Sequence, residues 1–279
     1  MRSLCLFADA LISTLFAPPC ACCGAVLDSP TSSPVCDACW RNVRRTTPPM
    51  CAVCGGPLAT AGAHAVCPLD RSPIRAARAL GPYEGVLRGL VHAIKFDHRR
   101  SLAAPLGVML RPAAADVLAD ADAVVPVPLH PWRLWRRGFN QAEDVARTLS
   151  DQRVPVLRAL RRVGATQPQS ALHADARRAN VRGAFRLNAW TARGKDAWRS
   201  RLAGATLVLV DDVTTTGATL EAAACVLIDA GAREVRAVTL ARVEAPKSGT
   251  TDFTDSTDSS LKMARRRQGD RSSAAVAMA

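Results

Sequence analysis

The feature that most constrains this fold is an apolar, β-rich run that ends in two adjacent acids. Thr206 to Val210 form a predicted buried strand, Asp211 and Asp212 follow it, and an apolar-periodic helix begins after a short turn. A strand, a tight turn and a helix in this order are typical of α/β folds with a parallel sheet. We therefore expect the strand to deliver both carboxylates to the carboxyl edge of a sheet, beside the N-terminus of a helix.

The turn between this strand and the helix has the composition of an anion-binding site. The first amides of a helix have no partner within the helix, and the helix dipole is positive there. Hydroxyl groups add donors, and small residues let a phosphate approach closely. The candidate binding residues are Val213, Thr214, Thr215, Thr216, Gly217, Ala218 and Thr219. The alternative is an ordinary turn in which Asp and Thr only cap the helix, but two acids followed by four threonines favour binding.

Ten cysteines, most of them in C-x-x-C pairs, mark a duplicated segment near the N-terminus. The first copy holds Cys20, Cys23, Cys36 and Cys39, and these four thiolates are enough to close a tetrahedral structural zinc site. The second copy repeats the spacing with Cys51, Cys54 and Cys67, and it has Asp70 where the first has its last cysteine. Asp70 or His64 could complete a second zinc site, or that site has decayed. Redox or disulfide chemistry is the alternative for the whole segment.

The bulk composition is that of a globular protein with a strongly basic surface. The chain has 279 residues, 48% of them hydrophobic, and a net charge of +13. The electrostatic field of such a basic protein attracts phosphorylated metabolites and nucleic acids alike. The net charge therefore does not distinguish between these two classes of ligand. Residues 4–16 are apolar, but Asp9 interrupts them and their helical spacing indicates an amphipathic helix rather than an export signal. No run reaches the length of a membrane span, and we expect a cytoplasmic protein.

Three motifs in order resemble the ComF family, which includes the competence protein ComFC. The acids and turn after residue 210 resemble the phosphoribosyl-pyrophosphate (PRPP) motif of type I phosphoribosyltransferases. Val125-Pro126-Val127-Pro128, then Arg136-Arg137-Gly138-Phe139-Asn140-Gln141, and the C-x-x-C segment complete the resemblance, which covers roughly residues 15–244. It implies an α/β fold, with a mostly parallel sheet flanked by helices as in type I phosphoribosyltransferases, and a small N-terminal module like a zinc ribbon.

The resemblance also implies roles for individual residues. Asp211 and Asp212 would hold the ribose 2′- and 3′-hydroxyls, and the turn would hold the 5′-phosphate. Arg137, the third residue assigned to catalysis, would bind the diphosphate, because a guanidinium can grip phosphate through two bonds. The alternative is that Arg133, Arg136 and Arg137 only form a solvated basic surface. Lys95 could also reach a phosphate, although a cation at a helix C-terminus is equally expected on structural grounds.

Two further segments complete the predicted substrate site. Pro126, Val127 and Pro128 would form the pyrophosphate loop. A mobile hood would contribute Gln167, Arg178 and Asn180 as ligand contacts, against the alternative of a polar loop that only connects elements.

The expected function is binding of PRPP with Mg²⁺ and transfer of its phosphoribosyl group to an unknown acceptor, with release of pyrophosphate. This chemistry requires clamping, charge neutralisation and exclusion of water rather than a protein nucleophile. The alternative from another class is a ComFC-like protein that handles single-stranded DNA without transfer, with a DNA-uptake helicase or other competence proteins as partners. A third possibility is a regulator that senses PRPP and signals through the zinc module.

The predicted organisation has four parts. An amphipathic helix covers 1–18, the cysteine module 19–72, the phosphoribosyltransferase-like domain 73–244 and a disordered tail 245–279. Within the third part, residues 72–81 are expected as a linker, 86–97 and 102–118 as helices, and 123–129 and 234–240 as strands entering or leaving loops. Residues 188–201 are expected as a surface insertion, and Cys225 is expected in the core.

Overall fold

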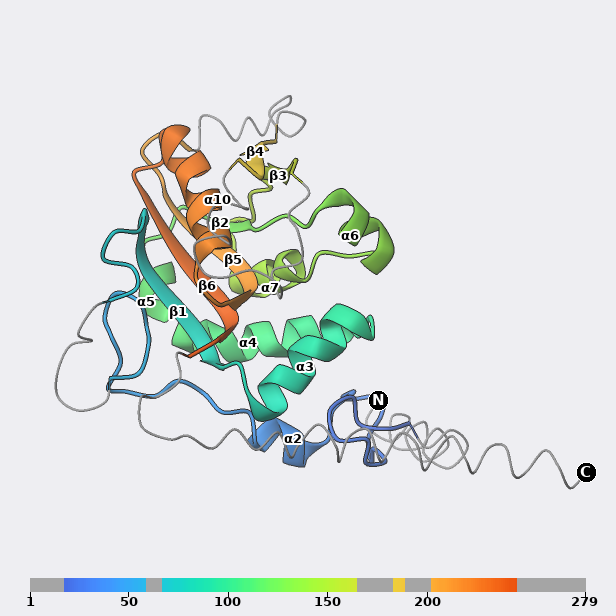
Figure 1. Cartoon of the computed structure of the whole chain (residues 1–279). Coiled ribbons are helices and arrows are strands. Elements are labelled where there is room, and N and C mark those ends of the chain that lie inside the picture. Colours follow the sequence, from blue (N-terminus) through green and yellow to red (C-terminus); the bar gives the residue numbers. More distant parts are fainter. Residues whose placement is uncertain (1–17, 59–66, 165–182, 189–201, 245–279) are drawn as a thin grey trace, which may run out of the picture. The chain divides into compact units, whose positions relative to one another are not determined.

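A computed structural model describes residues 18–58, 67–164, 183–188 and 202–244 of the chain. The predicted N-terminal amphipathic helix, most of the predicted surface insertion and the predicted tail lie outside the described residues. Within the described residues, the main body is built on a parallel sheet flanked by helices (Figure 1). This confirms the predicted fold class.

Four parallel strands form the central sheet in the order β1-β6-β5-β2. Their bounds are Ile74–Pro82 for β1, Ala123–Pro126 for β2, Thr206–Thr214 for β5 and Glu234–Arg242 for β6. A separate antiparallel pair joins β3 (Leu160–Arg162) to β4 (Phe185–Leu187). Since neighbouring strands of the main sheet are parallel, their carboxyl ends meet at one edge, where α/β proteins bind ligands.

Side chains alternate between the two faces along each strand, so both faces of this sheet carry apolar residues. Helices cover both faces. On one face, Val208 and Val210 of β5 join a core with α3 (Gly85–Phe96), α4 (Ala103–Ala113) and α7 (Gln141–Leu149). On the other face, Leu207 and Leu209 pack with α10 (Ala218–Asp229) and the β3–β4 pair. The shorter helices are α2 (Asp37–Arg41), η1 (Arg100–Leu102), α5 (Ala115–Leu118) and α6 (Pro131–Arg137).

Three expectations for single elements are corrected by the structure. Residues 74–82 form strand β1 and not a linker. The expected helix over 102–118 is divided into η1, α4 and α5. Pro112 lacks an amide N–H and so removes one hydrogen bond from the last turn of α4, and the chain leaves helical geometry at Ala114. Cys225 is exposed, because the buried face of α10 is formed by Leu220, Ala223, Ala224 and Leu227.

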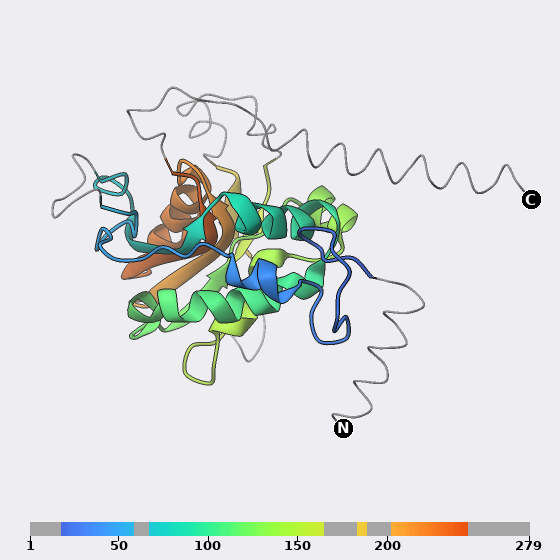
Figure 2. The same cartoon turned by 90° about the horizontal axis from the view of Figure 1, so that it is seen from below.

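The cysteine module packs against the sheet and shares its core. Cys20, Cys39 and Val43 belong to the same hydrophobic cluster as the helices α3 and α4. The view in Figure 2 shows α2 lying beside α4 on this face, where Trp40 and Met109 line the same pocket. Residues up to Glu244 form one compact unit, so the predicted boundary at residue 72 does not coincide with a break in packing.

Candidate functional site

The two acids of β5 lie at its carboxyl end and point to opposite faces of the sheet. Asp212 continues the side of Val208 and Val210, and Asp211 continues the side of Leu207 and Leu209. Asp212 is buried, whereas Asp211 is partly buried. The side chain of Asp211 also accepts a hydrogen bond of 2.8 Å from the backbone amide of Asp212. The pair is therefore present as predicted, but each carboxylate has its own surroundings.

A chain of polar contacts holds Asp212 in place. Lys95 Nζ of α3 lies 2.9 Å from one carboxylate oxygen, and Gln141 Nε2 of α7 donates to the other at 2.5 Å. Arg137 Nη1 then donates to Gln141 Oε1 at 2.5 Å. Lys95 thus contacts Asp212 directly, and Gln141 links Arg137 to the same acid. A carboxylate accepts about four hydrogen bonds, so Asp212 keeps acceptor capacity beyond these two donors.

Burial gives Asp211 and Arg137 unusual protonation equilibria. Burial, and then the adjacent charge of Asp212, raise the pKa of Asp211 to about 7. Burial lowers the pKa of Arg137, which the charge of Asp212 partly restores. Neighbouring groups with displaced pKa values are typical of functional sites, although structural ion pairs produce them as well.

Asp211 and the threonine turn surround a small hollow. Its volume is about 20 Å³, and it is lined by Asp211, Val213, Thr214, Thr215, Thr216, Gly217, Ala218, Thr219 and Leu220. Gly217 precedes α10 and has a φ of 81°, a conformation that suits glycine. The N-terminal amides of α10 open onto this turn, as an anion site requires. All the predicted turn residues lie around this hollow, whereas Asp212 is not among its lining residues.

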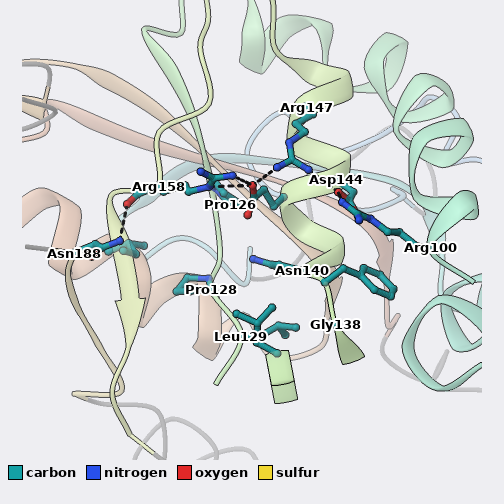
Figure 3. Close-up of a pocket in the computed structure, with 14 residues that line it drawn as sticks. Arg100, Pro126, Pro128, Leu129, Gly138, Asn140, Asp144, Arg147, Arg158 and Asn188 are labelled. Atoms are coloured by element: carbon teal, nitrogen blue, oxygen red, sulfur yellow. Dashed lines mark hydrogen bonds and ion pairs between the residues drawn. The ribbon is translucent and has the colours of Figure 1, made fainter. Parts of the chain in front are cut away.

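The predicted pyrophosphate loop lines a larger cavity beside β2. The amide of Val127 donates to the Val210 carbonyl at 2.9 Å, and Asn140 Nδ2 donates to the Val127 carbonyl at 3.1 Å. Asn140 also caps α7, accepting from the amide of Ala142 at 3.2 Å, as its position before the helix predicts. Pro126 and Pro128 line a cavity of about 340 Å³ between the end of β2, α6, α7 and the β3–β4 pair (Figure 3).

Charged side chains form one wall of this cavity. Arg158 pairs with Glu143, and Arg100 pairs with Asp144 at 2.7 Å. Arg147 contacts both acids, at 2.5 Å and 2.8 Å (Figure 3). Of these five residues the sequence motifs point only to Glu143, three positions after the N-cap Asn140. The pairing itself depends on how α7 meets η1 and the segment before β3.

Gln141 and Arg162 are the other residues that sequence reasoning missed. Gln141 stood in the quoted motif, but its contact with an acid 71 positions away is a property of the fold. Arg162 of β3 is buried, and its guanidinium lies 5.4 Å from the ring centre of Phe185. Burial lowers the pKa of Arg162, as does Arg133, while Asp211 raises it. Arg162 therefore adds positive charge on the Asp211 side of the sheet.

The first cysteine set has the geometry of a zinc site. The sulfur atoms of Cys20, Cys23, Cys36 and Cys39 all lie within 4.8 Å of one another. The amides of Cys22 and Cys36 donate to Cys20 Sγ at 3.5 Å and 3.4 Å. Burial raises the pKa of Cys20, but hydrogen bonds from the backbone amides of Cys23, Cys36 and Cys22 outweigh it, and the pKa falls to about 6. Four converging thiols with a stabilised thiolate fit tetrahedral Zn²⁺.

The second set repeats the backbone of the first. Cys20 and Cys51 each close the same turn, donating from their amides to Ala25 at 2.7 Å and to Gly56 at 2.8 Å. The sulfur atoms of Cys51, Cys54 and Cys67 lie within 4.8 Å of one another. Asp70 does not join this group, and His64 lies outside the described residues. The described chain thus supplies three thiol ligands for a second metal.

The remaining predicted ligand contacts, Gln167, Arg178 and Asn180, lie outside the described residues. Among the residues that the structure describes, the two cysteine sets are the metal-binding clusters found, and no helix is long and apolar enough to cross a membrane.

Comparisons with known proteins agree with this two-part organisation. A model described as a phosphoribosyl transferase domain matches residues 134–261, and a double zinc ribbon domain matches residues 11–68. The first match includes β5, its acids and the threonine turn. The second contains all but one of the predicted zinc ligands, since Asp70 falls outside it. The solved structure of TT1426 from Thermus thermophilus is 25% identical, covering 58% of this chain and 92% of that one, at a TM-score of 0.26, which is too low to support an argument about the fold.

Curated relatives cover most of the chain. The DNA utilization protein YhgH of Salmonella typhimurium is 32% identical over 225 residues, which cover 75% of this chain and 90% of the relative. Competence protein F of Haemophilus influenzae is 33% identical over 216 residues, with the same coverage. Similarity of this extent shows that the chain, which combines a double zinc ribbon with a phosphoribosyl transferase domain, belongs to the ComF family.

Proposed function

We propose that this chain binds PRPP with Mg²⁺ and transfers its phosphoribosyl group to an acceptor, releasing pyrophosphate. The observation that carries the proposal is the hollow in which Asp211 meets the threonine turn at the N-terminus of α10. A carboxylate that accepts from a diol, next to amides and hydroxyls that donate to a phosphate, is complementary to a 5-phosphorylated ribose.

The chemistry would be displacement at the ribose C1 atom. The bond from C1 to the diphosphate oxygen breaks, the diphosphate leaves with the electron pair, and a bond forms from the acceptor, whose proton passes to solvent. Asp211 would orient the ribose, with Asp212 adding its remaining acceptor capacity to the diol. Arg137 would neutralise the leaving diphosphate, supported by the Gln141 contact that fixes its guanidinium.

Mg²⁺ would be bound mainly through the substrate. Magnesium in such sites is held by substrate phosphates, water and one or two carboxylates. Asp212, Asp144 and Glu143 already pair with lysine, glutamine or arginine. When bound, the ion would add positive charge next to the departing diphosphate.

The names of the relatives support a second candidate function, the handling of single-stranded DNA. The relatives are called DNA utilization proteins and competence protein F. The net charge of +13 is compatible with an anionic polymer as ligand, as it is with a phosphorylated metabolite. In this candidate the protein is cytoplasmic and works with a DNA-uptake helicase or other competence proteins, whether or not it transfers phosphoribose.

Calorimetry with PRPP and Mg²⁺ tests the first proposal. We expect the Asp211→Asn, Asp212→Asn double variant to bind PRPP at least about 100-fold more weakly, because each substitution removes a charged acceptor. Asp229→Asn, which changes an exposed acid on α10, should bind like the wild type. Equal affinity in all three proteins would remove the PRPP proposal. Screening pyrophosphate release against nucleobases and amines then separates transfer from binding alone.

A further inference from the structure

Helix α6 exposes large apolar side chains and contributes none to the core. It spans Pro131–Arg137, and none of its seven residues is buried. Trp132 is 60% exposed, Leu134 43% and Trp135 75%. Figure 1 shows α6 projecting away from the four-stranded sheet. Since the core does not explain two exposed indoles on one short helix, their role lies at the surface.

The two indoles form a stacked pair. Their ring centres lie 5.1 Å apart, and their planes are inclined by 24°. Each ring stands mostly in water, so a flat ligand can reach a free aromatic face. Nucleobases stack on such faces whatever their sequence, because every base has a π-face.

Positive charge is interleaved with this pair. Arg133 and Arg136 are exposed, and neither makes an ion pair or side-chain hydrogen bond with any residue in the described ranges. Both lie close enough to Arg137 to lower its pKa. Aromatic rings that alternate with unpaired guanidinium groups are the arrangement that single-stranded nucleic acids require, since bases and phosphates alternate along the strand.

The helix also connects to the candidate catalytic site. Arg137 ends α6 and contacts Gln141, which in turn binds Asp212. His98 Nδ1 lies 3.3 Å from the Arg137 carbonyl and fixes this end of the helix against the segment after α3. Helix α6 is therefore linked to Asp212 through Arg137 and Gln141.

We propose that Trp132 and Trp135 form a base-stacking platform for single-stranded nucleic acid, with Arg133 and Arg136 contacting its phosphates. The platform rests on the DNA-handling part of the proposed function and does not depend on phosphoribosyl transfer. It assigns a binding surface to α6, which the PRPP proposal uses only at Arg137.

Fluorescence anisotropy of a labelled oligothymidylate of about 20 nucleotides tests the platform on the full chain. Trp132→Ala and Trp135→Ala should each weaken binding by about 5- to 100-fold, whereas Trp132→Phe and Trp135→Phe should restore most of it because the ring remains. All four variants should keep the wild-type melting temperature and PRPP affinity, because α6 buries no side chain.

Salt dependence separates the arginines from the indoles. In the Arg133→Gln, Arg136→Gln variant, the slope of log K against log salt concentration should become shallower by about 1.4, which is two single-strand phosphate contacts. The alanine variants of the tryptophans should keep the wild-type slope. Tighter binding of a duplex than of the single strand by the wild type would contradict stacking.

Two failures can be told apart. If the wild type binds no oligonucleotide at low salt, the DNA-handling function itself is lost, and with it the platform. If the wild type binds but the Trp132→Ala, Trp135→Ala double variant binds equally well, only the platform is overturned. Loss of self-association or of a protein partner in that double variant, with DNA binding unchanged, would assign the surface to protein docking and also overturn it.

Discussion

Asp211 and Asp212 are neighbours in the chain but differ in their chemistry. Because side chains alternate between faces along β5, Asp212 points toward Lys95 and Gln141, whereas Asp211 faces the threonine turn. With cationic and amide donors in contact, Asp212 is held as a hydrogen-bond acceptor. Asp211 accepts instead from a backbone amide, and its pKa is raised to about 7. The carboxyl end of β5 thus holds two acids with different partners, Asp212 beside Lys95 and Gln141, and Asp211 beside the threonine turn.

The raised pKa of Asp211 predicts a gain in stability when the acid is removed. The folded state keeps the Asp211 proton up to a pH of about 7, while the unfolded chain releases it near 3.8. The unfolded state therefore loses the proton first, and stability falls as the pH rises from about 4 to about 7. At pH 8, Asp211→Asn should be more stable than the wild type by about 1–3 kcal/mol.

Thermal unfolding between pH 4 and pH 8 checks this prediction. The difference between Asp211→Asn and the wild type should grow with pH over that window, and the exposed control Asp229→Asn should show no such trend. A variant less stable than the wild type at pH 8 would contradict the prediction. Loss of PRPP binding in the more stable protein would mark Asp211 as a residue kept for function.

At this scale, residue types could be predicted from the sequence but their partners could not. The acids, the threonine turn and the capping role of Asn140 follow from local rules for strands and helix ends. The contact of Gln141 with Asp212 joins α7 to β5, and no local pattern encodes it. Lys95 lies in the last turn of its helix, as one of the two interpretations expects, but its pairing with Asp212 follows from the fold alone.

At the scale of elements, the packing of α4 against α7 depends on a glycine. A Cβ atom added to Gly107 of α4 would overlap Thr148 Oγ1 of α7. Leu106 and Leu110, on either side along α4, are fully buried in the same core. The missing side chain therefore sets how closely the two helices approach, and α7 carries Gln141 to the site at that distance.

Replacing this glycine should destabilise the protein. We expect Gly107→Ala to lower the free energy of unfolding by about 1–3 kcal/mol, because overpacking forces the helices apart. Thr148→Ala in the same chain should recover part of the loss, since it removes the hydroxyl that collides. Val108→Ala, at a 64% exposed position of the same helix, is the matched control and should be close to neutral. Equal stability of Gly107→Ala and Val108→Ala in urea unfolding would contradict this close packing.

Element prediction failed where composition hid the periodicity. Strand β1 reads Ile-Arg-Ala-Ala-Arg-Ala-Leu, with few β-branched residues, and its strand character comes from pairing with β6. One helix over 102–118 is expected because apolar spacing continues across this segment, yet α4 runs through Pro112 only to Ala113 and helical geometry is interrupted at Ala114. In contrast, β5 and α10 could be predicted, because their apolar residues match the strand and helix periods closely.

At the scale of the molecule, metal binding and the fold of the body are linked. Arg78 of β1 is buried and donates to the carbonyls of Ala52 at 2.9 Å and Val53 at 3.4 Å, inside the second cysteine turn. It also pairs with Asp116 of α5. Arg242, at the end of β6, donates to the carbonyl of the ligand residue Cys54. The second cysteine set is therefore fastened to two strands of the sheet.

The zinc assignment predicts metal contents for single variants. The wild type should contain at least one zinc per chain, and Cys36→Ser with Cys39→Ser should lose one, because too few thiolates remain in the first set. Cys22→Ser is the matched control and should keep the wild-type content, since Cys22 lies among the ligands without joining them. Atomic emission measurements on purified protein give the count. An unchanged count in the double variant would disprove the ligand assignment.

The contacts of Arg78 and Arg242 also decide where this chain can be shortened. A fragment that begins at residue 73 would leave both guanidinium groups without the carbonyls that they bind here, and it would bare the apolar residues that Val43 and Leu27 cover. The two family models match separate stretches of the sequence. The phosphoribosyl transferase part nevertheless needs its contacts with the cysteine module in order to fold. Truncation at residue 73 should therefore yield a chain that aggregates instead of an isolated transferase domain.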